Sequence, residues 1–128
     1  SNDIEMELTK AEAQIMDIVW QNEPLYFKSI LEHLPEPKPA SSTVATLLKR
    51  IQEKQFIAFR LHGNSRQYYS LVPKTAYFKN QLGNLVRNFF DNSPVAFASF
   101  FTEQSTLSKK ELEALKAIID AQIKAKDQ

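Results

Sequence analysis

The spacing of the hydrophobic residues changes from a helical to an alternating period near Gln55, and this change constrains the fold most strongly. Before it, apolar side chains recur every three or four residues and predict a helix with one buried face: Val44, Leu47, Leu48 and Ile51. After Gln55, large apolar residues occupy every second position, namely Ile57, Phe59 and Leu61, which is typical of a strand. Residues 67–72 are again strand-like. Between these stretches, Gly63 falls where a tight turn needs a positive φ. The sequence therefore predicts a helix followed by a β-hairpin.

Two further helices are expected upstream of this unit. Thr9 and Glu12 have the spacing of a capping box, which predicts a helix that continues to the stop signal at Pro24. A second, shorter helix is indicated by hydrophobic residues at helical spacing: Phe27, Ile30, Leu31 and Leu34. It should end before the proline-rich residues 35–39. The order of three helices and a hairpin is typical of a winged helix-turn-helix domain, predicted here for residues 6–73.

Residues 74–128 are expected to form a helical arm without strands. Six of the nine Phe residues lie in this segment. Ser93-Pro94 and the capping box formed by Ser108 and Glu111 mark the starts of its later helices. An arm of this size is too small to bury its apolar side chains against itself, so we expect a homodimer. The predicted dimerisation residues are Phe78, Leu82, Leu85, Phe89, Phe97, Phe101, Leu112, Leu115 and Ile119. The alternative is an arm folded back onto the first domain.

The fold class expected from these patterns is mostly α with a small β-hairpin. Charge is unevenly distributed along the chain, although the formal net charge is only +1. Residues 1–37 carry a net charge of −6, residues 38–73 carry +5, and residues 74–128 carry +2. A basic central segment favours a surface that binds polyanions, although an uneven solvated surface would give the same count.

Short polar and basic side chains on the third helix and the hairpin suit phosphates and base edges in DNA. The predicted DNA-binding residues are Ser41, Ser42, Thr43, Thr46, Lys49, Arg50, Arg60, His62, Asn64 and Arg66. The third helix is expected to enter the major groove, and the hairpin to lie along the backbone. The alternative function is a winged-helix module that binds protein and has no specific affinity for DNA.

Composition argues against catalysis and metal binding. The chain has no Cys, and neither His33 nor His62 has a second ligand at metal-binding spacing. Two glycines are too few for a phosphate-cradling loop, and no nucleophile motif occurs. No apolar run approaches the length of a membrane span. We therefore expect a cytoplasmic, non-enzymatic protein with no membrane insertion, no metal, no cofactor and no small-molecule substrate.

Four stretches together resemble the BlaI/MecI penicillinase-repressor family over nearly the whole chain. They are LTKAEAQIMDIVW at residues 8–20, TVATLLKRIQEK at residues 43–54, YYSLV at residues 68–72 and LSKKELEAL at residues 107–115. The resemblance implies a cytoplasmic bacterial dimer that represses transcription by binding a palindromic operator. It also implies pairing with a membrane sensor protease that responds to a β-lactam or another signal, and inactivation by proteolysis in the arm.

The chain departs from this family in three places. Members commonly have Trp-Ser-Pro-Lys-Thr at the start of the recognition helix, whereas residues 39–43 here read PASST, so the operator sequence is expected to differ. The Cys-rich tail of the copper-responsive members is missing, which excludes copper sensing through thiolates. The usual Asn-Phe cleavage pair is also missing, and the aligned bond joins Phe100 and Phe101. The alternative role for this aromatic run is dimer core.

Overall fold

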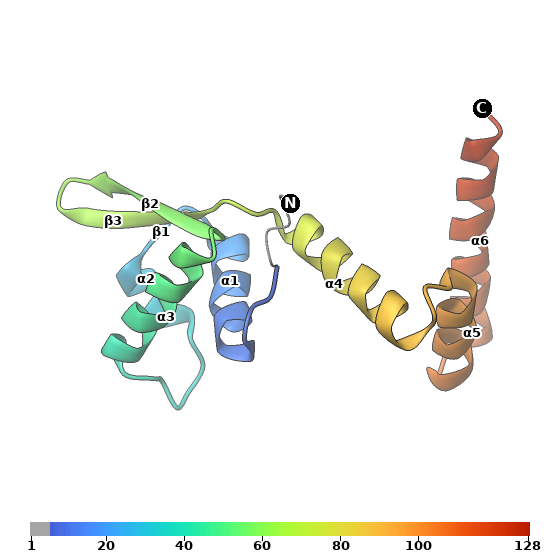
Figure 1. Ribbon diagram of the computed structural model, residues 1–128, viewed down its shortest axis with the longest axis horizontal. Helices are drawn as coiled ribbons and strands as arrows, with labels where there is room; N and C mark the ends of the chain where they lie inside the picture. The colour runs from blue at the N-terminus through green and yellow to red at the C-terminus, as the bar shows by residue number, and fades with distance from the viewer. Residues whose placement is uncertain (1–5) are drawn as a thin grey trace. The chain divides into compact units, whose positions relative to one another are not determined.

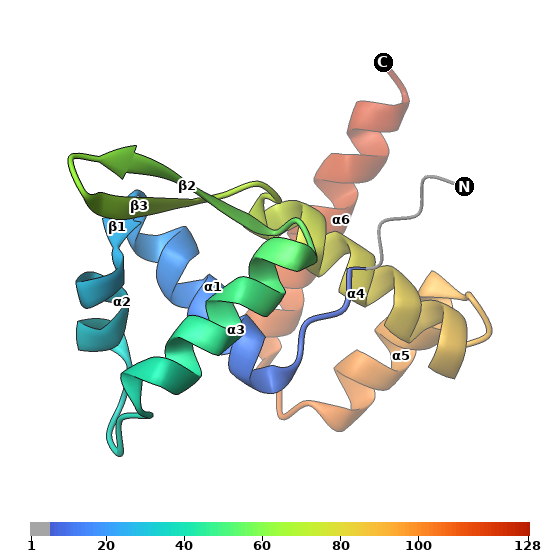
Figure 2. The same ribbon diagram turned by 60° about the vertical axis from the view of Figure 1, so that its left-hand side comes forward.

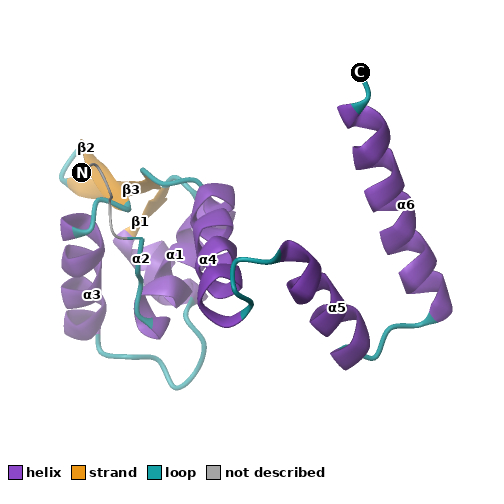
Figure 3. Cartoon of the chain, turned by 45° about the vertical axis from the view of Figure 1, so that its right-hand side comes forward, coloured by secondary structure: helices purple, strands orange, loops and turns teal. Residues whose placement is uncertain are grey.

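The computed structural model describes residues 6–128 and divides the chain into two compact units. The first unit ends at Leu82, and the second covers residues 83–128. The helices are α1 (Lys10–Asn22), α2 (Phe27–His33), α3 (Ser41–Glu53), α4 (Lys74–Phe89), α5 (Pro94–Gln104) and α6 (Lys109–Lys126). The strands are β1 (Leu25–Tyr26), β2 (Ile57–His62) and β3 (Ser65–Ser70), all within the first unit (Figures 1 and 3). This arrangement confirms the predicted fold class.

Helix α1 begins as its capping box predicts. The Thr9 hydroxyl accepts a hydrogen bond from the Glu12 backbone at 3.2 Å, and the Glu12 carboxylate accepts one from the Thr9 backbone at 2.8 Å. The helix ends at Asn22, and Glu23 before Pro24 is already extended. Ile15, Met16 and Val19 are fully buried, so this helix supplies one wall of the core.

Helices α2 and α3 present their apolar faces to the same core. Ile30 of α2 is buried, as are Val44, Leu48 and Ile51 of α3. The Lys38 ammonium caps α2 by donating to three carbonyl oxygens at 2.7–3.1 Å, those of Leu31, Glu32 and Leu34. The loop that joins α2 to α3 is therefore fastened to the end of α2.

The sheet has three antiparallel strands in the order β1-β3-β2, and it lies beside the helices (Figure 2). The predicted hairpin is confirmed, and Gly63 has the expected positive φ of 64°. Strand β3 begins two residues earlier than predicted, because His62 pairs with Ser65 around a two-residue turn. Glycine at the first position of such a turn is typical of type II′. Strand β1 was not predicted, since two residues cannot show an alternating pattern.

The first turns of α4 complete the core of the first unit. Tyr77 is buried, and its ring meets Phe56 edge-on at 5.6 Å and Trp20 at 5.7 Å. The Trp20 indole donates to the Val72 carbonyl oxygen at 2.9 Å, which fixes the chain just before α4 starts. These aromatic contacts explain why the first unit extends into this helix as far as Leu82.

The second unit contains the end of α4 together with α5 and α6. Ser93 caps α5 by accepting from the Ala96 backbone at 3.0 Å, and Pro94 occupies the first turn. Ser108 and Glu111 form the predicted capping box of α6. Neither α5 nor α6 buries a residue within a single chain.

Candidate nucleic-acid interface

Helix α3 presents a polar face opposite its buried residues. The predicted DNA-binding residues on this helix are all exposed: Ser41, Ser42, Thr43, Thr46, Lys49 and Arg50. The Thr46 hydroxyl donates to the Ser42 carbonyl oxygen at 3.0 Å, so its lone pairs remain available as acceptors. Within residues 6–128, neither Lys49 nor Arg50 takes part in an ion pair. The two cations are therefore available to an outside anion.

The hairpin formed by β2 and β3, hereafter the wing, carries the other predicted residues: Arg60, His62, Asn64 and Arg66. All of them are exposed, but they do not share one face. Arg66 pairs in register with Leu61, which puts it on the same face as Phe59, and its guanidinium lies 4.2 Å from the centre of the Phe59 ring. Arg60 lies on the opposite face, 5.0 Å from the centre of the Tyr69 ring.

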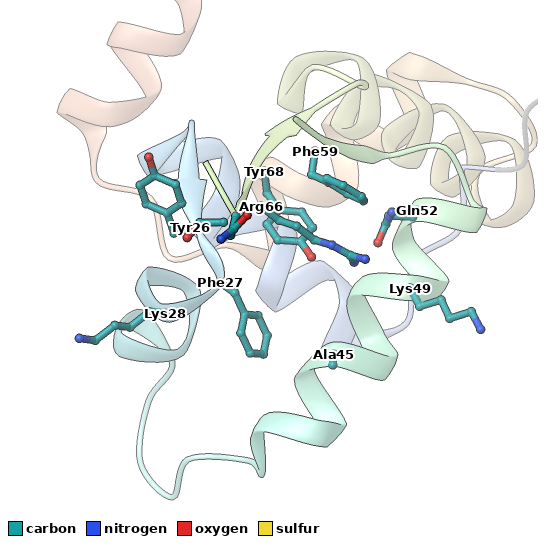
Figure 4. A pocket seen from close by; sticks show the side chains of 11 residues that line it. Tyr26, Phe27, Lys28, Ala45, Lys49, Gln52, Phe59, Arg66 and Tyr68 are labelled. Atoms are coloured by element: carbon teal, nitrogen blue, oxygen red, sulfur yellow. The ribbon is translucent and has the colours of Figure 1, made fainter. Parts of the chain in front are cut away.

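A groove of about 720 Å³ separates α3 from the wing (Figure 4). Lys49 lines it from α3, and Asn64 and Arg66 line it from the wing. The floor is aromatic, with Phe27, Phe59 and Tyr68 among its lining residues. The structure thus brings three of the predicted residues to one groove that combines cations with apolar rings.

The remaining predicted residues lie outside the groove. Arg60 and His62 are on the opposite face of the wing. Ser41, Ser42 and Thr43 occupy the first turn of α3, and Thr46 and Arg50 lie farther along its exposed side. The other lining residues were not predicted to bind DNA, and they include two long polar side chains, Lys28 of α2 and Gln52 of α3. Lys28 carried no signal in the sequence, because only the tertiary fold brings α2 beside α3. The helical period already placed Gln52 one turn beyond Lys49 on the same side of α3.

A half-buried ion pair holds the end of α3 to α1. The Lys54 ammonium donates to the Glu12 carboxylate at 2.5 Å and to the Glu7 carbonyl oxygen at 3.0 Å. Burial alone would raise the pKa of the Glu12 carboxyl. Three effects outweigh burial and hold that pKa below its ordinary value: the hydrogen bond from Lys54, the hydrogen bonds with Thr9, and the positive charge of Lys54. Glu12 is therefore a carboxylate at neutral pH, and it fixes the orientation of α3.

The other predicted surface is that of dimerisation, and its residues divide between the units. Phe78 and Leu82 belong to the first unit, where the Phe78 ring lies 6.3 Å from that of Trp20. The second unit holds the rest: Leu85, Phe89, Phe97, Phe101, Leu112, Leu115 and Ile119. There an apolar groove of about 670 Å³ is lined by Leu85, Phe89, Phe90, Phe97, Phe100 and Phe101. The side chain of Phe89 is 76% exposed.

Among residues 6–128, no cluster of three or more His, Asp or Glu side chains is arranged to hold a metal ion. None of the helices described there is both long and apolar enough to cross a bilayer.

Comparison with known proteins agrees with the architecture. The family model described as penicillinase repressor matches residues 8–121. The methicillin resistance regulatory protein MecI of Staphylococcus aureus strain N315 is 28% identical over 115 residues, which covers 89% of this chain and 94% of MecI. MecI of Mammaliicoccus sciuri is 27% identical over the same shares. An uncharacterized 16.5 kDa protein of Latilactobacillus sakei is 24% identical over 90% of this chain and 80% of its own length.

These matches confirm the resemblance that the sequence motifs indicated. They span the three helices, the wing and most of the arm, so they cover both compact units. The chain belongs to the penicillinase repressor family and is a transcriptional repressor of the BlaI/MecI type, not an enzyme.

Proposed function

We propose that this repressor is a cytoplasmic bacterial homodimer that binds a palindromic operator in double-stranded DNA. Residues 6–73 bind DNA, and residues 74–128 hold the two copies together. The observation that carries the proposal is the groove between α3 and the wing, because it combines Lys49 and Arg66 with an exposed polar helix face. Its cations suit the phosphate backbone, and the helix face suits base edges.

In this mechanism α3 of each copy enters a major groove, and repression is steric. The buried Val44, Leu48 and Ile51 fix the face that α3 turns outward. Thr46 and Arg50 on that face read base edges, and Arg66 of the wing neutralises a phosphate. Two-fold symmetry of the dimer requires two half-sites in opposite orientation, spaced by about one helical turn or a small multiple of it.

The exposed apolar surface of the second unit supports dimerisation. Phe89 and Val95 are each more than three-quarters exposed in one chain, and α5 and α6 have no buried residue. Contiguous apolar surface of this kind is normally covered by a partner. A second copy is the commonest partner for a soluble chain, which favours a symmetric dimer.

Release from DNA is proposed to follow cleavage of the Phe100–Phe101 bond by a membrane sensor protease. That bond lies within α5, and the Phe101 carbonyl accepts from the Ser105 backbone at 3.0 Å. Because proteases bind extended segments, cleavage requires α5 to unwind locally. Mass spectrometry of the repressor from induced cells tests this step. A fragment that begins at Phe101 is expected, and an intact chain after induction would contradict it.

Fluorescence anisotropy with the upstream intergenic DNA and a scrambled duplex, titrated across salt, tests DNA binding. The logarithm of affinity should fall with the logarithm of salt concentration, with a slope of about −0.9 for each phosphate neutralised. Arg66→Ala should weaken both duplexes equally and reduce the slope by about one contact. Arg50→Ala should weaken the intergenic duplex more than the scramble. Lys126→Ala, in the last turn of α6, removes the same charge and should leave both affinities unchanged.

Two results would contradict the proposal. Weak binding of both duplexes with no dependence on salt would favour the alternative function, a winged-helix module that binds protein. Equal losses on the two duplexes for Arg50→Ala would remove that residue from base reading and leave it as a phosphate contact.

A further inference from the structure

The Tyr26 side chain connects the two edge strands of the sheet. Tyr26 lies in β1 and pairs with Gln67 of β3, while His62 is the last residue of β2 on the far side of β3. The Tyr26 hydroxyl lies 2.6 Å from His62 Nδ1, and the two rings are stacked with their centres 6.1 Å apart. Tyr26 is among the residues that line the groove, and in Figure 4 its ring points away from Lys49. The Tyr26 side chain therefore crosses the face of the sheet that carries Arg60 and His62, and it reaches the tip of the wing.

This hydrogen bond determines which nitrogen of the neutral His62 ring carries the proton. A neutral imidazole has one acceptor nitrogen and one donor nitrogen. A phenol is the stronger acid of the two neutral groups, so we assign the Tyr26 hydroxyl as the donor and Nδ1 as the acceptor. The proton of the ring is then on Nε2. His62 is exposed, so its Nε2–H is available as a donor to an outside group.

The wing tip has few other anchors. Strand β1 pairs with β3 only at Tyr68 and Gln67, so it does not extend alongside Ser65 and Arg66, the first residues of β3 after the turn. Residues 60–66 are all exposed. A bond from β1 to His62 therefore restrains a segment that otherwise depends on the β2–β3 ladder alone.

We propose that Tyr26 is a positioning residue for the wing. Its hydroxyl holds the His62 ring so that Nε2–H donates a hydrogen bond to a phosphate oxygen of bound DNA. This inference rests on the proposed function, because it assigns to His62 a contact with the DNA backbone. Tyr26 itself need not touch the DNA.

The substitution Tyr26→Phe tests the inference, since it keeps the stacked ring and removes only the hydroxyl. Anisotropy with a random-sequence duplex of about three helical turns at low salt measures the phosphate contact. Tyr26→Phe and His62→Ala should each weaken binding by about two- to tenfold, the range expected for one hydrogen bond. The double variant should be no weaker than His62→Ala, because both changes remove the same contact. Tyr69→Phe is the matched control and should bind as the wild type does.

A second measurement does not depend on DNA. Long-range ¹H–¹⁵N NMR of the imidazole at about pH 8.5, where imidazole is neutral, reports which ring nitrogen carries the proton. Nε2–H is expected in the free protein, and a mixture of both tautomers in Tyr26→Phe. A proton on Nδ1 in the wild type would overturn the inference. Unchanged affinity of Tyr26→Phe, or additive losses in the double variant, would also overturn it.

Failure of this inference is distinguishable from failure of the proposed function. If Arg66→Ala weakens binding while Tyr26→Phe does not, the DNA-binding function stands and only the role of Tyr26 is lost. If the wild-type protein binds no duplex even at low salt, the proposed function fails and the phosphate contact of His62 fails with it.

Discussion

The ion pair between Glu12 and Lys54 gives the sharpest test of how α3 is held. The Glu12 side chain is 1% exposed, and one of its carboxylate oxygens accepts from both the Thr9 backbone and the Lys54 ammonium. The substitution Glu12→Gln removes the charge but keeps the shape and an oxygen for the cap of α1. It leaves the Lys54 ammonium at the end of α3 without its charged partner, although the bond to the Glu7 carbonyl oxygen remains.

The expected loss of stability follows from burial. Removing one partner of a fully buried ion pair costs about 3–5 kcal/mol. The Lys54 side chain is 35% exposed, so water can solvate the ammonium in the variant, and we expect a loss of about 2 kcal/mol. For a domain of this size, that loss lowers the Tm by about 10 °C. Glu12→Gln combined with Lys54→Met should lose less, because no charge is left unpaired.

The stability that the Glu12 carboxylate contributes changes with pH in a defined direction. The pKa of Glu12 is lowered in the folded protein from its ordinary value of 4.5. The carboxylate therefore makes its full contribution to the free energy of unfolding when the pH is above 4.5, and this contribution is lost as the pH falls through the lowered pKa. The difference in free energy of unfolding between wild type and Glu12→Gln should be largest at neutral pH and should shrink in acid.

Urea unfolding monitored by the fluorescence of Trp20, the single tryptophan, measures this difference. Glu53→Gln is the matched control, because Glu53 is exposed on α3 and the substitution removes the same charge. It should change the free energy of unfolding by less than about 0.5 kcal/mol. A Glu12→Gln variant as stable as the wild type, or equally destabilised at acid and neutral pH, would refute the reasoning.

Three further substitutions probe other contacts. Trp20→Phe leaves the Val72 carbonyl without its donor and should lower the free energy of unfolding by about 1–2 kcal/mol, measured in urea by circular dichroism because the variant has no tryptophan; an unchanged midpoint would show that water replaces the bond. Gly63→Ala should cost about 1–2 kcal/mol because of the positive φ, whereas Gly63→Asn should cost less; equal thermal stability of the two variants would contradict a backbone cause. Phe89→Asp should dissociate the proposed dimer in light-scattering measurements and keep the circular dichroism of the fold, while a variant that stays dimeric would place Phe89 outside the interface.

Features coded by neighbouring residues could be predicted from the sequence. Both capping boxes, the change of period after Gln55 and the turn at Gly63 depend on short spacings, and the structure confirms each of them. Strand β1 could not be predicted, since its two residues become a strand only by pairing with β3. The burial of Tyr77 was also missed, because it depends on contacts with Trp20 and Phe56, which are distant in the sequence.

In the candidate site, too, the sequence predicted what depends on neighbouring residues and missed what depends on strand pairing. The helical period identified the exposed face of α3 correctly, but the four predicted wing residues were not assigned to the two faces of the hairpin. Arg66 faces the groove and Arg60 does not, and the difference follows from the register set by the two-residue turn. Once the length of that turn is known, the alternation of side chains assigns each residue to its face.

The two elements proposed to contact DNA are held to the fold in different ways. Helix α3 is anchored along its length by three buried residues, and beyond its end by the ion pair of Lys54 with Glu12. The wing tip is exposed, and beyond its own ladder it is held by β1 and the bond between Tyr26 and His62. On the proposed function, base reading belongs to the rigid element, where a fixed geometry gives discrimination. The phosphate contacts belong to the less constrained element, which can follow the backbone of different DNA sequences without loss of register.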